Sequence, residues 1–190
     1  MTDAMMLASK LTLPSFADDG RFLHAQPVMA VGKVRIISDT VDSDFRKALL
    51  VEPPPAGRQI EHNGVTIAWL APGEWLLTGT ANAVRTVLDR VTRAVPDLSI
   101  ALDITHGRAC FEFGGTQARD AIAGVCGLDV RERSFAVGSV ARTTLGATGM
   151  FIARLSDEGA TPRFRLIVDQ TMAAYAARML RQPGQYRKAP

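Results

Sequence analysis

The chain has 190 residues, of which 47% are hydrophobic and 22% charged, so it is long enough for one domain, or two small ones, with a sizeable core. Its formal net charge is only +3 and its basic residues are spread along the chain, which argues against a nucleic-acid-binding surface. Because it has no apolar run near the roughly 20 residues of a membrane span and no signal-peptide pattern at its N-terminus, we expect a cytoplasmic protein that does not bind membranes.

The first third of the chain predicts an arm, a strand and a helix. Residues 1–30 have a mixed composition without a regular period, and we expect them to form a loosely ordered N-terminal arm. Residues 31–38 are short and β-branched, which is typical of a strand. A helix over residues 41–51, with Asp42 or Ser43 as its N-cap, then ends at three successive prolines.

The stretch WLAPGEWLL predicts a β-hairpin. Residues 65–70 alternate between two faces, and a second strand starts at Trp75. Between the strands, Pro72 presets φ for one turn position and Gly73 tolerates the positive φ of the next. The stretch could also cradle a ligand, but a turn whose flanking Trp69 and Trp75 cover the sheet end explains it without one.

Helices and strands follow one another irregularly in the rest of the chain. Residues 81–95 carry valine and leucine at intervals of three and four, which indicates an amphipathic helix. A second helix follows Gly114–Gly115 with Thr116 as its N-cap, and the last helix covers residues 171–181. Strands are expected near residues 99–103, 108–113, 139–145, 150–155 and 163–168. This order predicts an α+β fold, with antiparallel or mixed sheets and packed helices.

No arrangement of side chains indicates catalysis. Cys110 and Cys126 form no CxxC pair, so we expect two buried thiols rather than a disulfide or a zinc site. The three histidines fall in predicted loops, and none has an acid or nucleophile at a spacing that indicates a dyad. The backbone N–H groups of Gly114–Gly115 could bind an anion, but without a following lysine or a third glycine a plain strand-to-helix turn is favoured. We therefore predict no catalytic residue and no metal site.

Asp103 is a carboxylate at the end of an apolar strand, where burial is costly without a hydrogen bond. A folate pterin could supply that bond through adjacent N–H donors, which makes Asp103 a candidate cofactor-binding residue. The favoured alternative is that Asp103 accepts N–H bonds from the turn at residues 105–107. Arg108 and Arg142 could bind an acidic ligand, the Asp103 carboxylate, or the carboxylates of a neighbouring subunit.

Three stretches, in this order, resemble the gamma subunit family of heterotetrameric sarcosine oxidases. They are WLAPGEWLL, LDITHGRACFEFGGTQARDAIAGVCGLDV, and the segment from SFAVGSVARTTLGATGMFIARL to FRLIVDQTMAAYAARML. In the first stretch, Pro72, Glu74 and Trp75 match the family pattern, whereas Ala71 and Gly73 depart from it. The second stretch is also similar to the wider aminomethyltransferase superfamily, with matches at Asp103, Thr105, Gly115, Ala118 and Ile122.

The resemblance runs over residues 31–181, which we expect to form one domain like the folate-binding aminomethyltransferase domain, followed by a basic C-terminal tail over residues 182–190. It implies alpha, beta and delta partner subunits that carry FAD, FMN, NAD and tetrahydrofolate, while this chain binds no cofactor itself. Candidate contacts with those subunits are Pro72, Glu74, Arg108 and Arg142.

Two functions of different classes are compatible with these observations. The first is a non-catalytic gamma subunit that supports the oxidative demethylation of sarcosine, with transfer of the one-carbon unit to tetrahydrofolate. The second is a free-standing folate-binding or aminomethyl-transfer protein that uses Asp103. An RNA-binding module ranks last because the positive charge is dispersed. The ordered motifs, together with the lack of a catalytic set, favour the first.

Overall fold

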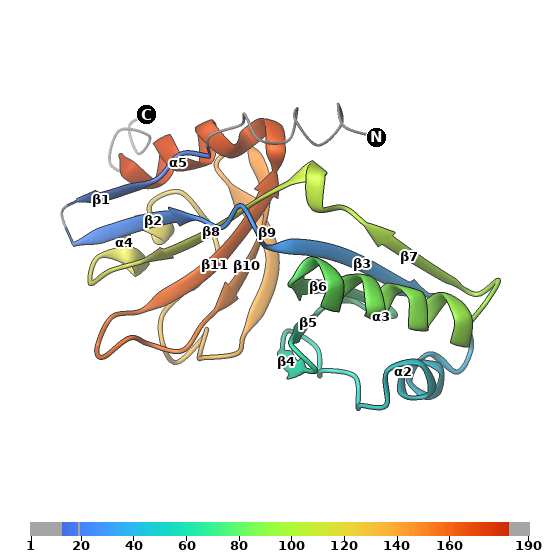
Figure 1. Cartoon of the computed structure of the whole chain (residues 1–190). Coiled ribbons are helices and arrows are strands. Elements are labelled where there is room, and N and C mark those ends of the chain that lie inside the picture. Colours follow the sequence, from blue (N-terminus) through green and yellow to red (C-terminus); the bar gives the residue numbers. More distant parts are fainter. Residues whose placement is uncertain (1–12, 19, 183–190) are drawn as a thin grey trace, which may run out of the picture.

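The computed structural model describes residues 13–18 and 20–182, which form two antiparallel sheets joined side by side (Figure 1). The six-stranded sheet has the order β1-β2-β8-β11-β10-β9, with strands at Phe16–Asp18, Arg21–Ala25, Arg108–Gly114, Arg163–Asp169, Thr148–Arg154 and Val140–Leu145. The five-stranded sheet has the order β4-β5-β6-β3-β7, with strands at Gln59–His62, Val65–Ala71, Glu74–Gly79, Ala30–Ile36 and Ser99–Asp103.

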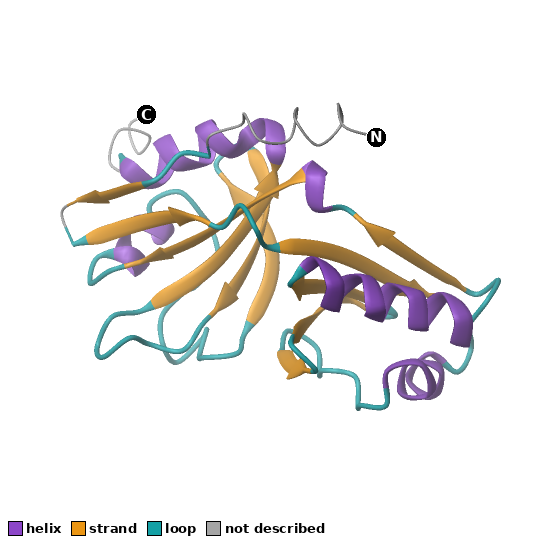
Figure 2. Cartoon of the chain, in the orientation of Figure 1, coloured by secondary structure: helices purple, strands orange, loops and turns teal. Residues whose placement is uncertain are grey.

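Helices pack on both sheets (Figure 2). The five-stranded sheet carries α2 (Val41–Leu49) and α3 (Ala81–Ala94), and the six-stranded sheet carries α4 (Ala118–Ala123) and α5 (Ala173–Arg181). Short 3-10 turns precede β8 at Thr105–Gly107 (η2) and α5 at Gln170–Met172 (η3). This arrangement confirms the predicted α+β class. In the part of the chain that the structure describes, no helix is long and apolar enough to cross a membrane.

The predicted hairpin of the two tryptophans is confirmed. β5 and β6 pair across the Pro72–Gly73 turn, and Trp69 lies directly opposite Trp75. Gly73 has a φ of +70°, and a side chain there would approach the Ile36 carbonyl oxygen to 2.7 Å. The turn therefore depends on this glycine both for its backbone conformation and for its space.

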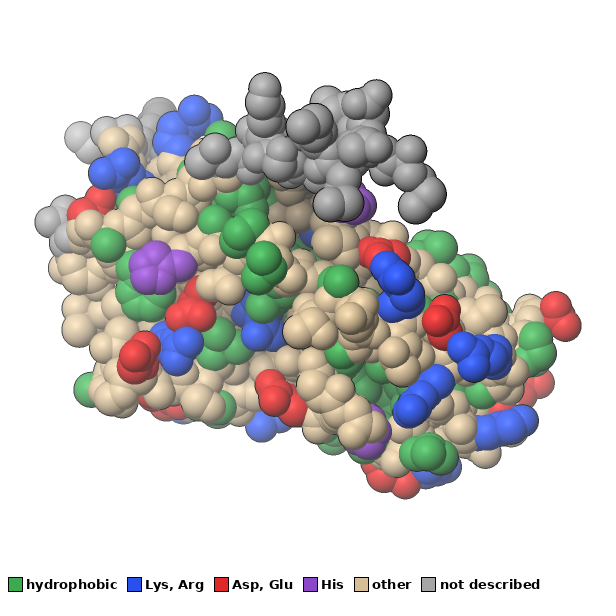
Figure 3. Space-filling model, viewed as in Figure 1, with side chains coloured by type: hydrophobic (Ala, Val, Ile, Leu, Met, Phe, Trp, Pro, Cys, Tyr) green, Lys and Arg blue, Asp and Glu red, His purple; other side chains and the backbone are tan. Residues whose placement is uncertain are grey.

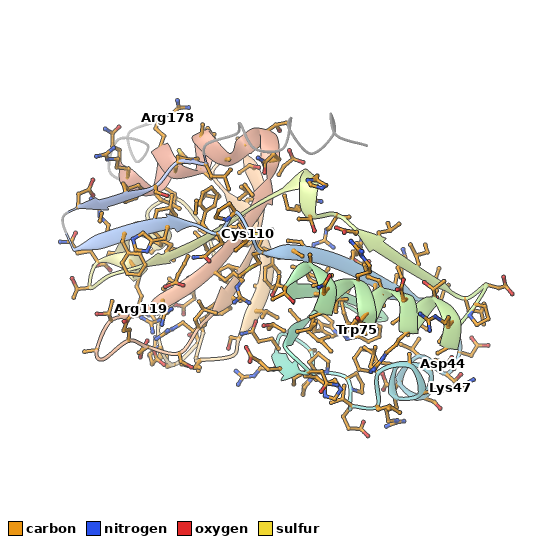
Figure 4. All side chains as sticks on the ribbon, viewed as in Figure 1. Asp44, Lys47, Trp75, Cys110, Arg119 and Arg178 are labelled. Atoms are coloured by element: carbon orange, nitrogen blue, oxygen red, sulfur yellow. The ribbon has the colours of Figure 1, made fainter. Side chains whose placement is uncertain are left out.

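Trp75 anchors the core between the five-stranded sheet and its helices (Figure 4). It is only 2% exposed, and its ring centroid lies 4.5 Å from that of Phe45 in α2. From α3 the predicted apolar stripe packs against the same core, through Val84, Val87, Leu88 and Val91. The stripe is the physical reason why residues 81–94 form a helix on this sheet.

The N-cap of α2 is Thr40, two residues before Asp42 and three before Ser43, the predicted N-caps. The hydroxyl groups of Ser38 and Thr40 both donate to the Asp44 carboxylate, at 2.6 and 3.1 Å. These hydrogen bonds, chiefly the one from Ser38, hold the pKa of Asp44 below its ordinary value. The helix therefore starts earlier because a carboxylate in its first turn ties down the residues that precede it.

The expectation of a loose arm over residues 1–30 was wrong for its second half. β1 and β2 pair with each other, and β2 also pairs with β8, which places Leu23 fully inside the core. The polar break at Gly20, with a φ of +72°, separates two short strands rather than marking disorder. Residues 1–12, and the predicted basic tail beyond residue 182, lie outside the described residues.

The Gly114–Gly115 pair is a tightly packed strand-to-helix turn. Gly115 has a φ of +121°, and a side chain there would come within 2.0 Å of the Gly20 carbonyl oxygen. Its N–H donates to the Pro162 carbonyl oxygen at 3.2 Å, so it is not free for an anion. The N-cap of α4 is Gln117 rather than the predicted Thr116.

A third apolar cluster joins the two sheets. It is made of Val31, Ala68, Leu76, Cys110, Val140, Phe151, Ala153 and Ile167. Beside it, the guanidinium of Arg165 donates to the hydroxyl groups of Thr78 and Thr66, at 2.9 and 3.4 Å. Burial lowers the pKa of Arg165, and these polar partners offset part of its desolvation. The apolar cluster is the contact through which the two sheets pack against each other.

Candidate functional site

A cavity of about 320 Å³ lies where the two sheets meet. Apolar side chains from both sheets line it, among them Leu70, Leu76, Ile104, Met150, Phe151 and Ile167. Its charged side chains are Lys33, Glu74, Arg108, Arg142 and Asp169. Three cations thus face two carboxylates. The arrangement can pair charges between the sheets, and it leaves one positive charge in excess.

Glu74 is the most buried charge of the cavity, at 8% exposure. It is the first residue of β6, immediately after the hairpin turn, and its side chain points to the face that meets the other sheet. Glu74 Oε1 lies 3.1 Å from Lys33 Nζ and 3.5 Å from Arg142 Nη1. Burying an unpaired carboxylate costs free energy, and the ion pairs with Lys33 and Arg142 offset the desolvation of Glu74.

Arg108 is held by Asp169, which lies opposite it in the register of β8 and β11. Arg108 Nη1 donates to Asp169 Oδ2 at 3.2 Å. Asp169 also accepts from the Thr171 hydroxyl at 2.7 Å and from the Thr171 N–H at 3.0 Å. These bonds from Thr171, together with Arg108, lower the pKa of Asp169. Arg108 therefore pairs with Asp169 and not with Asp103.

Three of the four predicted contact residues come together in this cavity. Glu74, Arg108 and Arg142 all line it, although they come from three different strands. Pro72 does not: it is exposed, and it borders a separate hollow beside the loop at Pro53–Ala56. That these residues touch a partner stays a prediction.

Sequence reasoning missed two charged members of the cavity, Lys33 and Asp169. Lys33 carried a signal, because it is a charged residue inside a β-branched strand, where a polar side chain must find a partner. The signal for Asp169 was weaker: it is an aspartate just before the last helix, a position where a carboxylate commonly caps the helix N-terminus.

Asp103 forms the turn that was favoured from the sequence. It accepts a hydrogen bond from the Thr105 N–H at 2.9 Å, and its side chain is exposed rather than buried. Hydrogen bonding by Thr105, first through its side chain and then through its backbone, lowers the pKa of Asp103. Asp103 does not line the cavity between the sheets. A role in cofactor binding stays a prediction.

The replacement Asp103→Ala is expected to lower the free energy of unfolding at pH 7 by about 1 kcal/mol, because the turn loses its acceptor. The folded-state pKa of Asp103 is lowered, so the stabilisation is present above the ordinary pKa of aspartate, about 3.9, and is lost as the pH falls below it. Urea unfolding at pH 7 and pH 2 measures both values. Asp103→Asn keeps a side-chain acceptor and should cost less. An equal loss in both variants at both pH values would contradict the turn.

The three histidines lie on separate elements. His24 is in β2 and stacks on Phe22 with 4.7 Å between the ring centroids. His62 ends β4, and its Nε2 is 2.8 Å from the Asn63 amide nitrogen. His106 lies in η2. The expectation that all three lie in loops was wrong for His24 and His62, which lie in the strands β2 and β4.

Both cysteines are buried free thiols, as predicted. Burial raises the pKa of Cys110 to about 11, and Figure 4 shows this residue near the junction of the two sheets. Among the described residues, no three side chains of His, Cys, Asp or Glu are placed to hold a metal ion. Neither thiol is therefore part of a metal-binding cluster in this part of the chain.

Cys110 is expected to resist alkylation in the native protein. With a pKa of about 11, only about one thiol in a thousand is ionised at pH 8, and burial blocks access as well. Mass spectrometry after iodoacetamide treatment should show labelling of Cys110 at least about 100-fold slower than in 8 M urea. Equal labelling rates in the two solutions would show that the thiol is accessible and activated.

A sequence model of the sarcosine oxidase gamma subunit family matches residues 38–184, which is more than half of the chain. The chain belongs to the sarcosine oxidase gamma subunit family. The matched range nearly coincides with residues 31–181, where the sequence stretches predicted the resemblance. A comparison with curated protein sequences found no significant match.

Solved structures show the fold of this gamma-family chain. The heterotetrameric sarcosine oxidase from Corynebacterium sp. U-96, in complex with pyrrole 2-carboxylate, matches with a TM-score of 0.75 and 20% identity, over 98% of this chain and 93% of that one. The glycine cleavage system aminomethyltransferase T from Bartonella henselae matches with a TM-score of 0.64 and 14% identity, over 93% of this chain and 55% of that one. The gamma-family chain thus spans about half of the aminomethyltransferase, and the predicted aminomethyltransferase-like fold is confirmed.

Proposed function

We propose that this gamma-family chain is the non-catalytic gamma subunit of a cytoplasmic, heterotetrameric sarcosine oxidase. It supports an assembly that demethylates sarcosine oxidatively and passes the one-carbon unit to tetrahydrofolate. Its partners are the alpha, beta and delta subunits, which carry FAD, FMN, NAD and tetrahydrofolate, while this chain binds none of them. The observation that carries the proposal is the family match over residues 38–184, and the likeness over 93% of a chain of a heterotetrameric sarcosine oxidase supports it.

The geometry supports a structural role more than a catalytic one. In the cavity, Glu74 is shared by Lys33 and Arg142, and Asp169 is bound by Arg108, so neither carboxylate is poised as a base. On the face shown in Figure 3, basic and acidic side chains are interspersed, which disfavours a nucleic acid as the partner. We infer that the charges serve the joint between the sheets and the contact with other subunits.

Co-expression with the alpha, beta and delta subunits tests the proposal. The chain is expected to elute with them in size-exclusion chromatography, and its omission is expected to reduce the yield of assembled, sarcosine-oxidising complex. The proposal fails if the chain elutes as a separate species while the other three subunits retain full oxidase activity without it.

Titration calorimetry of the isolated chain with tetrahydrofolate separates the proposal from the free-standing folate binder. No heat of binding is expected at millimolar ligand. Binding that is weakened in the variant Asp103→Asn would instead favour the folate binder.

A further inference from the structure

One face of the five-stranded sheet is only partly covered. In β3, Val34 and Ile36 point to the helices α2 and α3, so the residues between and beside them point to the opposite face. β7 is the last strand of this sheet, and its Leu102 and Ile100 lie opposite Lys33 and Arg35 of β3. We call this uncovered surface the β3–β7 face. It consists of Lys33, Arg35, Ile37, Leu98, Ile100 and Leu102.

Four of the six residues of the β3–β7 face are apolar although they are exposed. Ile37, Leu98, Ile100 and Leu102 are 55%, 48%, 44% and 49% exposed. Seven large hydrophobic residues are exposed in the described part of the chain. Four of them gather here: Ile100 and Leu102 lie in β7, and Ile37 and Leu98 respectively follow β3 and precede β7, where the Ile37 N–H donates to the Leu98 carbonyl oxygen. The solvated face of an antiparallel sheet is normally polar, and a contiguous apolar patch is typical of an interaction site. The six-stranded sheet, where it packs against the five-stranded sheet, does not cover these four side chains.

The outer edge of β7, the last strand of its sheet, also carries backbone N–H and C=O groups that can pair with another strand. Ile37 N donates to Leu98 O at 2.7 Å, and Ile104 N donates to Val31 O at 2.9 Å. In an antiparallel pair every second residue bonds to the neighbouring strand, so the backbone groups of Ser99, Ala101 and Asp103 point away from β3. An edge strand of this kind is a ready template for pairing with another chain.

The charges around the β3–β7 face define the chemistry of its partner. Lys33 and Arg142 share the single carboxylate of Glu74. Arg35 is exposed and lies opposite Glu74 in the register, yet within the described residues it forms no ion pair. Around Glu74, the three cations Lys33, Arg35 and Arg142 therefore outnumber the carboxylate by two, while the carboxylates of Asp97 and Asp103 lie at the two ends of β7. A complementary surface carries Asp or Glu.

A second copy of the chain fits this face poorly. In a two-fold symmetric dimer the same patch meets itself, so the excess positive charges of one copy would lie close to those of the other. A non-identical subunit with carboxylates avoids this repulsion. The charge pattern thus selects a heterologous partner.

We propose that the β3–β7 face docks on another subunit of the complex, through a segment that carries apolar side chains flanked by carboxylates and lies along the edge of β7. This proposal rests on the proposed function, because it requires the alpha, beta and delta subunits as the source of the partner. It adds the surface, the mode of contact and the chemistry of the contacting segment. The cavity with Glu74 and Arg142 adjoins this face and sets its charge.

A competition experiment tests the docking face. Wild-type and variant chains with different tags are co-expressed with the alpha, beta and delta subunits, and the ratio of the tags in the purified complex is measured. The double variant Ile100→Asp with Leu102→Asp is expected to be incorporated at least about tenfold less than the wild type. Arg35→Glu is expected to be incorporated less as well, because it reverses the free charge.

Two exposed positions away from the face serve as controls. Leu50→Asp places a charge on a residue that is 78% exposed at the end of α2, and Arg93→Glu reverses a charge on α3 whose side chain is 79% exposed. Both are expected to be incorporated like the wild type. If circular dichroism shows that the double aspartate variant is unfolded, Ile100→Thr with Leu102→Thr replaces it, because threonine favours strands.

The outcomes separate the two proposals. A folded double variant that is incorporated within twofold of the wild type, while the wild type assembles, would overturn the docking face alone. If the wild-type chain itself fails to join the complex, the proposed function is contradicted, and the docking face with it.

Discussion

The replacement Trp75→Ala is expected to lower the free energy of unfolding by about 3–5 kcal/mol, as measured by urea unfolding. Trp75 is 2% exposed, packs on Phe45 at 4.5 Å between ring centroids, and belongs to the core under α2 and α3. Within the described residues its Nε1 has no hydrogen-bond partner, so the loss comes from packing and from the cavity left behind.

Trp69→Ala is the matched control, because Trp69 lies directly opposite Trp75 in the same hairpin but is only half-buried. It should cost about 1–2 kcal/mol. If both variants lost the same free energy, Trp75 would not be the anchor of this core.

The replacement Gly115→Ala is expected to cost at least about 3 kcal/mol, or to prevent folding. The new Cβ would lie 2.0 Å from the Gly20 carbonyl oxygen, and the φ of +121° is a conformation that alanine rarely adopts. Neither conflict is relieved by moving a flexible side chain, because the obstacle is the backbone of the turn before β2. Thermal and urea unfolding would measure the loss.

Gly107→Ala provides the comparison, since a Cβ at Gly107 would meet nothing within 4 Å. Its effect should stay within about 0.5 kcal/mol. A Gly115 variant as stable as the Gly107 variant would contradict the close packing of the β8–α4 turn against β2.

Elements with a strong local pattern could be predicted from the sequence. The valine and leucine stripe of residues 81–94 and the Pro72–Gly73 turn determine their structure through short-range spacing and backbone preference alone. β1 and β2 could not be predicted, because strands of three and five residues carry little periodicity and gain their stability from pairing with β8. The N-cap at Thr40 depends on the bonds of Asp44, which helix spacing does not reveal.

Only single residues of the candidate site could be predicted from the sequence, and their partners could not. Arg108 and Arg142 were predicted as charged contacts, but their partners Asp169 and Glu74 are set by the register of β8 with β11 and by the joint between the sheets. Residues 99–103 were predicted as a strand. Ile100 and Leu102 of this strand are exposed because no other element covers this part of the sheet in the described residues. Such exposure depends on tertiary packing, which the local sequence pattern does not reveal.

Hydrogen–deuterium exchange of the chain, alone and in the assembled complex, would test its role as a docking subunit. We expect assembly to slow amide exchange in β7, at residues 99–103, and to leave the exchange of the exposed side of α3 unchanged. Unchanged exchange throughout β7 in a complex that contains the chain would contradict docking through the β3–β7 face.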